Sequence, residues 1–299
     1  MAIQWFPGHM HKARKEMAEV LHQVDLVLQI LDARIPFSSE NPMLAKLAAD
    51  KPIVRILNKS DLADPEQTQI WINELCSEKS QDALAVSASD PKAVKTIMSR
   101  LKSSSPPQAS SHPRPRIAMI VGIPNVGKST LINLLAGRAI TKTGNEPAIT
   151  RQQQVIKLNE AWSLRDTPGV LWPKVENEAS GYRLAATGAV RDTAMNSAEV
   201  AASLLDYVIE AYPDLLRQRF GDHLALSDSL STMEAIGRDR GCLGAGALVD
   251  FDRVGRLVLQ EFRDGLIGKI TLETIAMRDQ EIAQTEQLLA ARQAKRLQR

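Results

Sequence analysis

Residues 121–130 read VGIPNVGKST, a string that matches the pattern G-x-x-x-x-G-K-[ST] from Gly122 to Ser129. The apolar run RIAMIV at 116–121 predicts a buried strand before it, and GKSTLINLLAG predicts a helix that ends at Gly137. A glycine-containing turn between strand and helix lets backbone N–H groups face a phosphate, and the helix N-terminus adds positive potential. The stretch therefore predicts a phosphate-binding loop.

The loop and two segments behind it predict contacts to a nucleotide triphosphate. Lys128 would reach the β- and γ-phosphates, and the Ser129 hydroxyl would bind Mg²⁺. In DTPG, Asp166 could hold Mg²⁺ through water, and the Gly169 N–H could meet the γ-phosphate. In EPAITR, Thr150 is a candidate switch threonine. Taken singly, DTPG is most often a plain turn, but its place behind the loop favours the functional interpretation.

The string LNKSDL at 57–62 stands ahead of the loop, at the end of another apolar run, KPIVRILN. A carboxylate at Asp61 can accept hydrogen bonds from guanine N1–H and N2–H₂, donors that adenine lacks. Asn58 could hold the other edge of the purine, and the Lys59 stem could cover the base plane. SAS at 87–89, after the next predicted strand, could supply backbone N–H groups to guanine O6. As isolated strings, NKSD and SAS would most often be caps and turns.

The pattern of strands and helices divides the chain in two. Between about 25 and 170, apolar runs alternate with helical segments, which predicts an α/β fold with a mainly parallel sheet and helices on both faces. SSSPPQASSHPRPR at 103–116 predicts an exposed connector inside this sheet. From about 178 the chain is mainly helical, and SAEVAASLLDYVIEAY predicts a helix with a serine cap.

Composition excludes several classes of protein. The 299 residues include 44% hydrophobic residues and a net charge of +2, an ordinary globular balance that does not by itself indicate a nucleic-acid partner. Cys76 and Cys242 are too far apart in sequence to suggest a metal pair or a disulfide framework. No apolar run approaches the ~20 residues that span a bilayer, and the N-terminus lacks the apolar core of a signal peptide. We therefore expect a cytoplasmic protein without membrane contact.

Together these motifs resemble a circularly permuted GTPase, in which the base-reading elements precede the phosphate loop. The chain is similar to the ribosome biogenesis GTPase A (YlqF) family through WFPGHMHKA, DARIPFSSENP, GIPNVGKSTLIN, DTPGVLWP and FRDGLIGKITLE. The resemblance covers nearly the full chain. It implies a circularly permuted P-loop GTPase domain over 1–177, followed by a smaller all-helical RNA- and ribosome-binding domain over 178–299.

The resemblance also implies an activity and its partners. The activity is hydrolysis of GTP to GDP and phosphate, coupled to late assembly of the large ribosomal subunit and activated by that subunit. The expected partners are GTP or GDP, the large subunit and its rRNA. Mg²⁺ is the expected cofactor, K⁺ is a second candidate ion, and the protein is expected to be a monomer.

Carried over residue by residue, the resemblance completes the predicted site. The expected nucleotide contacts are Asn58, Lys59, Ser60, Asp61, Ser87, Ala88, Asn125, Val126, Gly127, Lys128, Ser129, Thr130 and Gly169. The expected metal ligands are Ser129, Thr150 and Asp166 for magnesium and Asn125 for potassium. Val170 stands where Ras-like GTPases place the glutamine that orients the attacking water. His9, in the motif PGHM, is the substitute that the family implies, with Thr150 as the other catalytic candidate. The alternative interpretation of His9 is a surface histidine beside the start of a helix.

Two other functions stay open on the residues alone. A phosphate loop also serves small-molecule kinases, whose base site would be indifferent to guanine. A GTPase that acts on tRNA or another RNA would carry the same motifs. Basic residues that could meet RNA phosphates, or could equally form solvated helix faces, are Lys12, Arg14, Lys15, Arg292, Lys295, Arg296 and Arg299.

Overall fold

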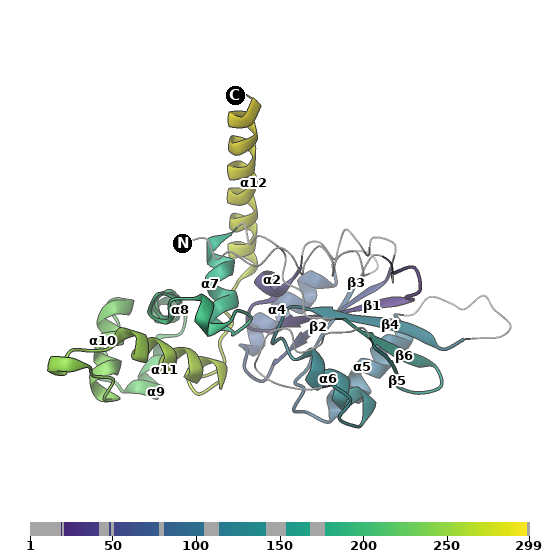
Figure 1. Cartoon of the computed structure of the whole chain (residues 1–299), viewed down its shortest axis with the longest axis horizontal. Helices are drawn as coiled ribbons and strands as arrows, with labels where there is room; N and C mark the ends of the chain where they lie inside the picture. Colours follow the sequence, from purple (N-terminus) through teal and green to yellow (C-terminus); the bar gives the residue numbers. More distant parts are fainter. Residues whose placement is uncertain are drawn as a thin grey trace.

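A six-stranded sheet and a following group of helices make up the part of the chain that the computed structural model describes (Figure 1). The described residues are 19, 21–41, 48, 51–77, 81–104, 114–141, 154–167 and 177–297. The strands are β1 (Leu26–Asp32), β2 (Ile53–Asn58), β3 (Gln81–Ala85), β4 (Arg116–Gly122), β5 (Gln154–Lys157) and β6 (Trp162–Asp166).

The order of the strands in space is β3-β2-β1-β4-β6-β5. Every neighbouring pair is parallel except β5 and β6, which are antiparallel. The chain therefore runs outward from β1 to the edge at β3, returns to the centre at β4, and fills the other half. Leu26 of β1 pairs with Ala118 of β4 at this central seam. The predicted α/β fold with a mainly parallel sheet is confirmed. Most of the predicted connector, residues 105–113, lies outside the described residues.

Helices cover both faces of the sheet because its central strands are apolar on both sides. All seven residues of β1 are buried, as expected for a parallel strand inside a sheet. Leu28 and Ile30 face the cluster that includes Ile97 of α5, whereas Leu31 belongs to the cluster around Trp71 of α4. The helices of this part are α2 (Pro36–Ser39), α4 (Pro65–Leu75), α5 (Lys92–Ser103) and α6 (Lys128–Ala136).

The chain after residue 177 is helical, as predicted. Its helices are α7 (Glu178–Ala186), α8 (Ser197–Ala211), α9 (Pro213–Phe220), α10 (Ser229–Asp239), α11 (Phe251–Arg263) and α12 (Ile275–Leu297), with short 3₁₀ turns at η1 (Asp192–Ala194) and η2 (Ala245–Ala247). The predicted serine cap of α8 is wrong by one residue. Asn196 is the cap, because its side chain accepts hydrogen bonds from the N–H groups of Ala198 and Glu199. Figure 1 shows α12 standing away from the other helices.

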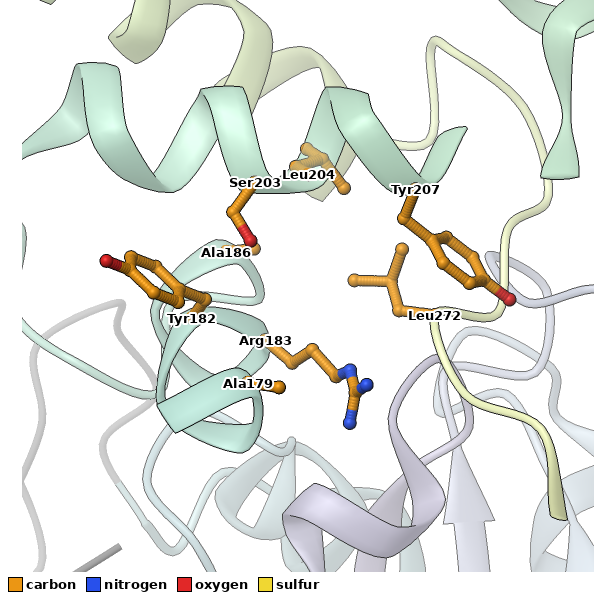
Figure 2. Close-up of a pocket in the computed structure, with 8 residues that line it drawn as sticks. All are labelled: Ala179, Tyr182, Arg183, Ala186, Ser203, Leu204, Tyr207 and Leu272. Atoms are coloured by element: carbon orange, nitrogen blue, oxygen red, sulfur yellow. The ribbon is translucent and has the colours of Figure 1, made fainter. Parts of the chain in front are cut away.

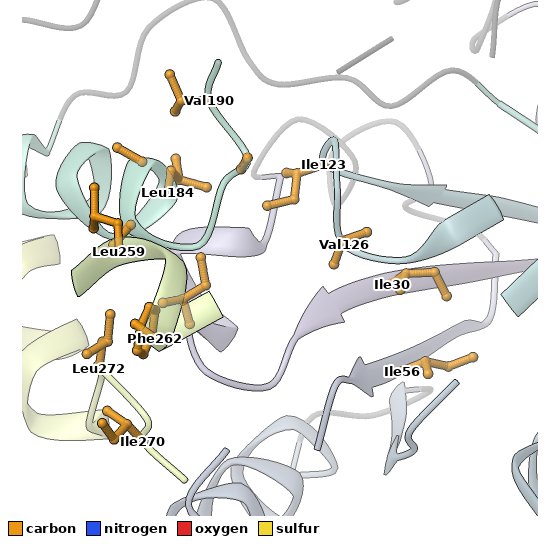
Figure 3. Close-up of a cluster of buried hydrophobic side chains, with 14 of the residues drawn as sticks. Ile30, Ile56, Ile123, Val126, Leu184, Val190, Leu259, Phe262, Ile270 and Leu272 are labelled. Atoms are coloured by element: carbon orange, nitrogen blue, oxygen red, sulfur yellow. The ribbon is translucent and has the colours of Figure 1, made fainter. Parts of the chain in front are cut away.

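One hydrophobic cluster continues from the sheet into the helices. It includes Ile30 and Val126 from the sheet and its phosphate loop, and Leu184, Phe262 and Leu272 from the helical part (Figure 3). The helical part therefore packs directly against the end of the sheet that carries the predicted site. The predicted division of the chain at 177/178 stays a prediction.

Membrane insertion finds no support in the helices that the structure describes. None of them combines the length and the apolar character that crossing a bilayer requires.

Candidate nucleotide-binding site

The loop between β4 and α6 has the backbone that its glycines predict. Asn125 and Gly127 adopt positive φ angles of 57° and 96°. A Cβ atom on Gly122 would lie 2.6 Å from the Ile30 carbonyl oxygen, and one on Gly127 would lie 2.2 Å from Asn58 Nδ2. Both glycines are therefore required by groups of β1 and β2, the strands that stand earlier in the chain.

Lys128 lies inside this loop. Its Nζ donates hydrogen bonds to the carbonyl oxygens of Gly122 at 3.0 Å and Ile123 at 2.7 Å. Burial lowers the pKa of Lys128 to about 8, and the nearby Asp166 carboxylate acts in the opposite direction. The loop therefore holds a desolvated cation whose charge an anionic ligand would stabilise.

The start of DTPG lies beside the loop, as the order of the strands requires. Asp166 ends β6 and pairs with Ile120 of β4, and its side chain is buried. The Thr167 hydroxyl donates to the Ile120 carbonyl oxygen at 2.7 Å. Two hard oxygen donors that suit Mg²⁺, the Ser129 hydroxyl and the Asp166 carboxylate, thus belong to the loop helix and to the strand next to β4. Phosphate oxygens and water would complete an octahedral shell, so the residues fit this ion.

Asn58 joins the early motif to the phosphate loop. Its Nδ2 donates to the Val126 carbonyl oxygen at 2.8 Å. Asn58 is buried, and its Oδ1 has no hydrogen-bond partner among the described residues. LNKSDL and the phosphate loop, distant in the sequence, therefore form one site.

Lys59 is held by two residues that the sequence did not assign to the site. Its Nζ lies 3.0 Å from Asp32 Oδ2 at the end of β1. Arg34 holds the same carboxylate through Nε at 2.9 Å and Nη2 at 2.8 Å. Burial alone would raise the pKa of Asp32, but Arg34 and Lys59 outweigh it and hold the pKa well below its usual range. The sequence signal that could have identified Asp32 and Arg34 is a charged pair at the end of a buried strand.

The rest of the base-reading elements lie side by side at the same edge of the sheet. The Ser60 N–H donates to the Val86 carbonyl oxygen at 3.2 Å, next to Ser87 and Ala88. The Ser87 and Ser89 hydroxyls are 2.6 Å apart. The Asp61 carboxylate is exposed and makes no hydrogen bond to the described part of the protein. The edge therefore presents an acceptor that a base could meet.

The remaining loop residues lie at the start of α6. Asn125 Nδ2 donates to the Gly188 carbonyl oxygen at 2.7 Å, just past the end of α7. The Ser129 carbonyl oxygen accepts from the Thr141 hydroxyl at 3.1 Å, and Thr130 is exposed. Asn125 therefore links the phosphate loop to the helical part. Three predicted residues, His9, Thr150 and Gly169, lie outside the described residues.

A separate small pocket lies between α7 and α8, lined by Tyr182, Arg183, Ser203 and Tyr207 among others (Figure 2). Arg183 points into it, but the guanidinium is bonded to Glu281 at 2.5 Å and lies near Glu273 at 3.3 Å. Its charge is already balanced, so the pocket does not add a second anion site.

Comparison with known proteins agrees with this geometry. A family model described as "50S ribosome-binding GTPase" matches residues 117–225, from β4 onward. The ribosome biogenesis GTPase A of Priestia megaterium is 45% identical over 280 residues, which cover 91% of this chain and 97% of that protein. The mitochondrial ribosome-associated GTPase 1 of Mus musculus is 33% identical, with 90% of each protein covered.

Solved structures show the same fold. The GNP-bound YlqF from T. maritima superposes with a TM-score of 0.63 at 24% identity, covering 88% of this chain and 98% of that one. Its GDP-bound form gives a TM-score of 0.62 over 87% of this chain and 99% of that one. At this level of identity the likeness concerns the fold.

Proposed function

The chain belongs to the ribosome biogenesis GTPase A family, and on that premise we propose that it is a guanine-nucleotide switch that assists late assembly of the large ribosomal subunit. The reaction is hydrolysis of GTP to GDP and phosphate. The observation that carries the proposal is the 2.8 Å hydrogen bond between Asn58 and the Val126 carbonyl, because it joins the base-reading and phosphate-binding elements in one site.

Each element of the site has a task in this proposal. The Asp61 carboxylate accepts from guanine N1–H and N2–H₂, the Lys59 stem covers the base, and the backbone at Ser87 and Ala88 meets O6. Asn58 offers its Oδ1, which has no partner in the described part of the chain, to a donor and keeps Ser60 and its neighbours beside the loop. The backbone of the phosphate loop and Lys128 neutralise phosphate charge. The loop contacts are Asn125, Val126, Gly127, Lys128, Ser129 and Thr130, with Gly169 at the γ-phosphate.

Metal ions supply further positive charge. When bound, Mg²⁺ neutralises charge on the β- and γ-phosphates, and Ser129, Thr150 and Asp166 are the residues that would hold it. For potassium the proposed ligand is Asn125. The hydrogen bond from its Nδ2 to Gly188 supports this role, because it determines which way the amide faces. His9 and Thr150 remain the proposed catalytic residues, with His9 positioning water where Val170 cannot.

The helical part, residues 178–299, is the proposed contact to rRNA and the ribosome, in a monomeric cytoplasmic protein. Loss of the γ-phosphate would move DTPGVLWP, which leads directly into α7, and would thereby change the helical part. GTP then favours the form that binds the maturing subunit, and hydrolysis releases it. The proposal also includes activation of hydrolysis by the bound subunit, which would have to lower the activation free energy of the reaction.

Cosedimentation with isolated large subunits tests the proposal. The protein should sediment with subunits when a non-hydrolysable GTP analogue is present and remain in the supernatant with GDP. Small subunits serve as the control particle. Equal sedimentation with both nucleotides, or none with either, would contradict the proposed nucleotide-dependent binding to the large subunit.

A further inference from the structure

The segment Ile270–Glu273 passes along the base-reading end of the sheet. It connects α11 to α12, and all four of its side chains are buried. Figure 3 shows Ile270 and Leu272 next to Phe262, at the junction of the helical part with the sheet. We call Ile270–Glu273 the C-terminal strap.

The strap bonds to the chain directly after the guanine motif. The Ile270 N–H donates to the Leu62 carbonyl oxygen at 3.1 Å. The Thr271 hydroxyl oxygen accepts from the Asp64 N–H at 3.2 Å. A Cβ atom on Gly265, at the end of α11, would lie 2.7 Å from Leu62 Cδ2, so the approach is close. The two residues that flank Ala63 are therefore both held by the strap.

Tyr212 strengthens the same contact from α8. Its hydroxyl donates to Asp64 Oδ2 at 3.1 Å and lies 3.3 Å from the Thr271 carbonyl oxygen. Asp64 also caps α4, through acceptance of the Glu66 and Gln67 N–H groups. Tyr212, Asp64 and Thr271 thus form one network at the start of α4.

The strap also bonds to the segment that follows β1. The Leu272 N–H donates to the Arg34 carbonyl oxygen at 2.8 Å, and Arg34 holds the Asp32 carboxylate that pairs with Lys59. The Glu273 carboxylate accepts from the Phe37 N–H at 2.8 Å. The strap therefore contacts the backbone next to Asp61, and it is connected to Lys59 through Arg34 and Asp32.

Asp61 itself has no hydrogen bond to the described part of the protein, so its position depends on its neighbours. On one side, the Ser60 N–H is anchored to Val86, which directly follows β3. On the other side, the Leu62 carbonyl is anchored to Ile270, which belongs to the strap. The Leu62 N–H also closes the turn on the Lys59 carbonyl oxygen at 2.9 Å, so the strap is the contact that ties this turn to the helical part.

We infer that the C-terminal strap is a positioning element of the guanine site, which sets base discrimination by holding the backbone on the far side of Asp61. This rests on the proposed reading of guanine by Asp61. This coupling passes through the base and not through the γ-phosphate, so any nucleotide with a guanine base should stabilise the strap. By linkage, binding of the base must stabilise the strap in return.

The test uses conservative variants of the full chain. Tyr212→Phe with Thr271→Val removes the hydroxyls at the strap and keeps the packing. Tyr182→Phe with Thr232→Val is the matched control, because both residues lie in the helical part and neither hydroxyl bonds to the strap or to the base-reading loop. Equilibrium affinities for GDP and IDP are measured, since hypoxanthine lacks the 2-amino group that Asp61 would bind. Thr271→Val alone repeats the measurement with a smaller change.

The wild type and the control should prefer GDP over IDP by about tenfold, as one well-placed hydrogen bond to a charged group allows. In the strap variants this preference should fall to about threefold or less. An unchanged preference in the strap variants, or an equal fall in the control, would overturn the inference. A wild type that binds GDP and IDP equally would instead overturn guanine reading by Asp61.

Amide hydrogen exchange of the wild-type protein tests the same inference without any variant. GDP should slow exchange in a peptide covering residues 267–274, because the Ile270 and Leu272 amides donate to the base-reading region. A peptide covering α10 serves as the reference and should not change. Equal exchange at 267–274 with and without GDP would contradict the inference.

Discussion

At the scale of single residues, we propose that recognition of the base rests on Asp61. Replacement of Asp61 by Asn should weaken GTP binding by about 10- to 100-fold, because an amide cannot accept both guanine donors. The same variant should gain affinity for xanthosine triphosphate, which carries an oxygen where guanine has the amino group. Affinities for both nucleotides check the expectation, with Asp252→Asn on the exposed face of α11 as the control. A variant that keeps its GTP affinity would favour a base site indifferent to guanine, as in a kinase.

The buried cation of the phosphate loop predicts a dependence of stability on pH. Burial lowers the pKa of Lys128 to about 8 in the folded protein, whereas its ordinary value is 10.5. Between these values the unfolded chain binds a proton that the folded chain lacks, so the unfolding free energy rises with pH. Relative to Lys128→Met, the nucleotide-free wild type should gain up to about 3 kcal/mol between pH 8 and 10.5.

Urea unfolding of both proteins at several pH values measures this gain. Below about pH 8 Lys128 is charged in both states, so the difference between wild type and Lys128→Met should be constant there. A constant difference across the whole range would show that Lys128 is not desolvated in the folded loop.

Much of the site could be predicted at this scale, because its residues belong to short strings with defined chemistry. Asn58, Lys128 and Asp166 lie together as their motifs require. Asp32 and Arg34 were not assigned, since a charged pair after a strand has no distinctive spacing. Their role appears only when β1 and β2 are paired, with Asp32 opposite Asn58.

At the scale of elements, the short helix α2 depends on a residue far along the chain. The Glu273 carboxylate accepts from the Phe37 and Ser38 N–H groups, and the Arg183 guanidinium lies beside it. Glu273→Ala should lower the unfolding free energy by about 2–4 kcal/mol, because it leaves the N–H groups of Phe37 and Ser38 without their acceptor. Urea denaturation at neutral pH measures the change.

Glu286→Ala is the matched control for this prediction. Glu286 is exposed on α12, so its removal should change the unfolding free energy by no more than about 0.5 kcal/mol. Equal stability of Glu273→Ala and Glu286→Ala would mean that the strap does not hold α2 in solution.

Helices and strands whose apolar residues recur at a regular spacing could be predicted from the sequence. Connections without such a spacing could not. The apolar runs of β1, β2 and β4 and the helical stripe of α8 carry their own patterns. The C-terminal strap has no regular secondary structure, so no periodicity marks it. Its partners, Leu62 and Arg34, are about two hundred residues away, and only the folded arrangement shows them.

At the scale of the whole molecule, the reversed order of the motifs has a structural consequence. The early strands β1 to β3 fill one half of the sheet, and the chain returns to its centre at β4. The helical part then touches the site at two places, through Gly188 at the phosphate loop and through the strap at the base-reading loop. The state of the nucleotide should therefore change the helical part, including α12, which stands out from the molecule (Figure 1).

The rate of GTP hydrolysis with and without isolated large ribosomal subunits tests this central claim most directly. The protein alone should hydrolyse GTP slowly, because Val170 cannot orient the attacking water. Large subunits should raise the rate by about tenfold or more, since lowering the activation free energy by about 1.4 kcal/mol is enough for that change. Small subunits should leave the rate unchanged. An equal rate with and without large subunits would contradict the account.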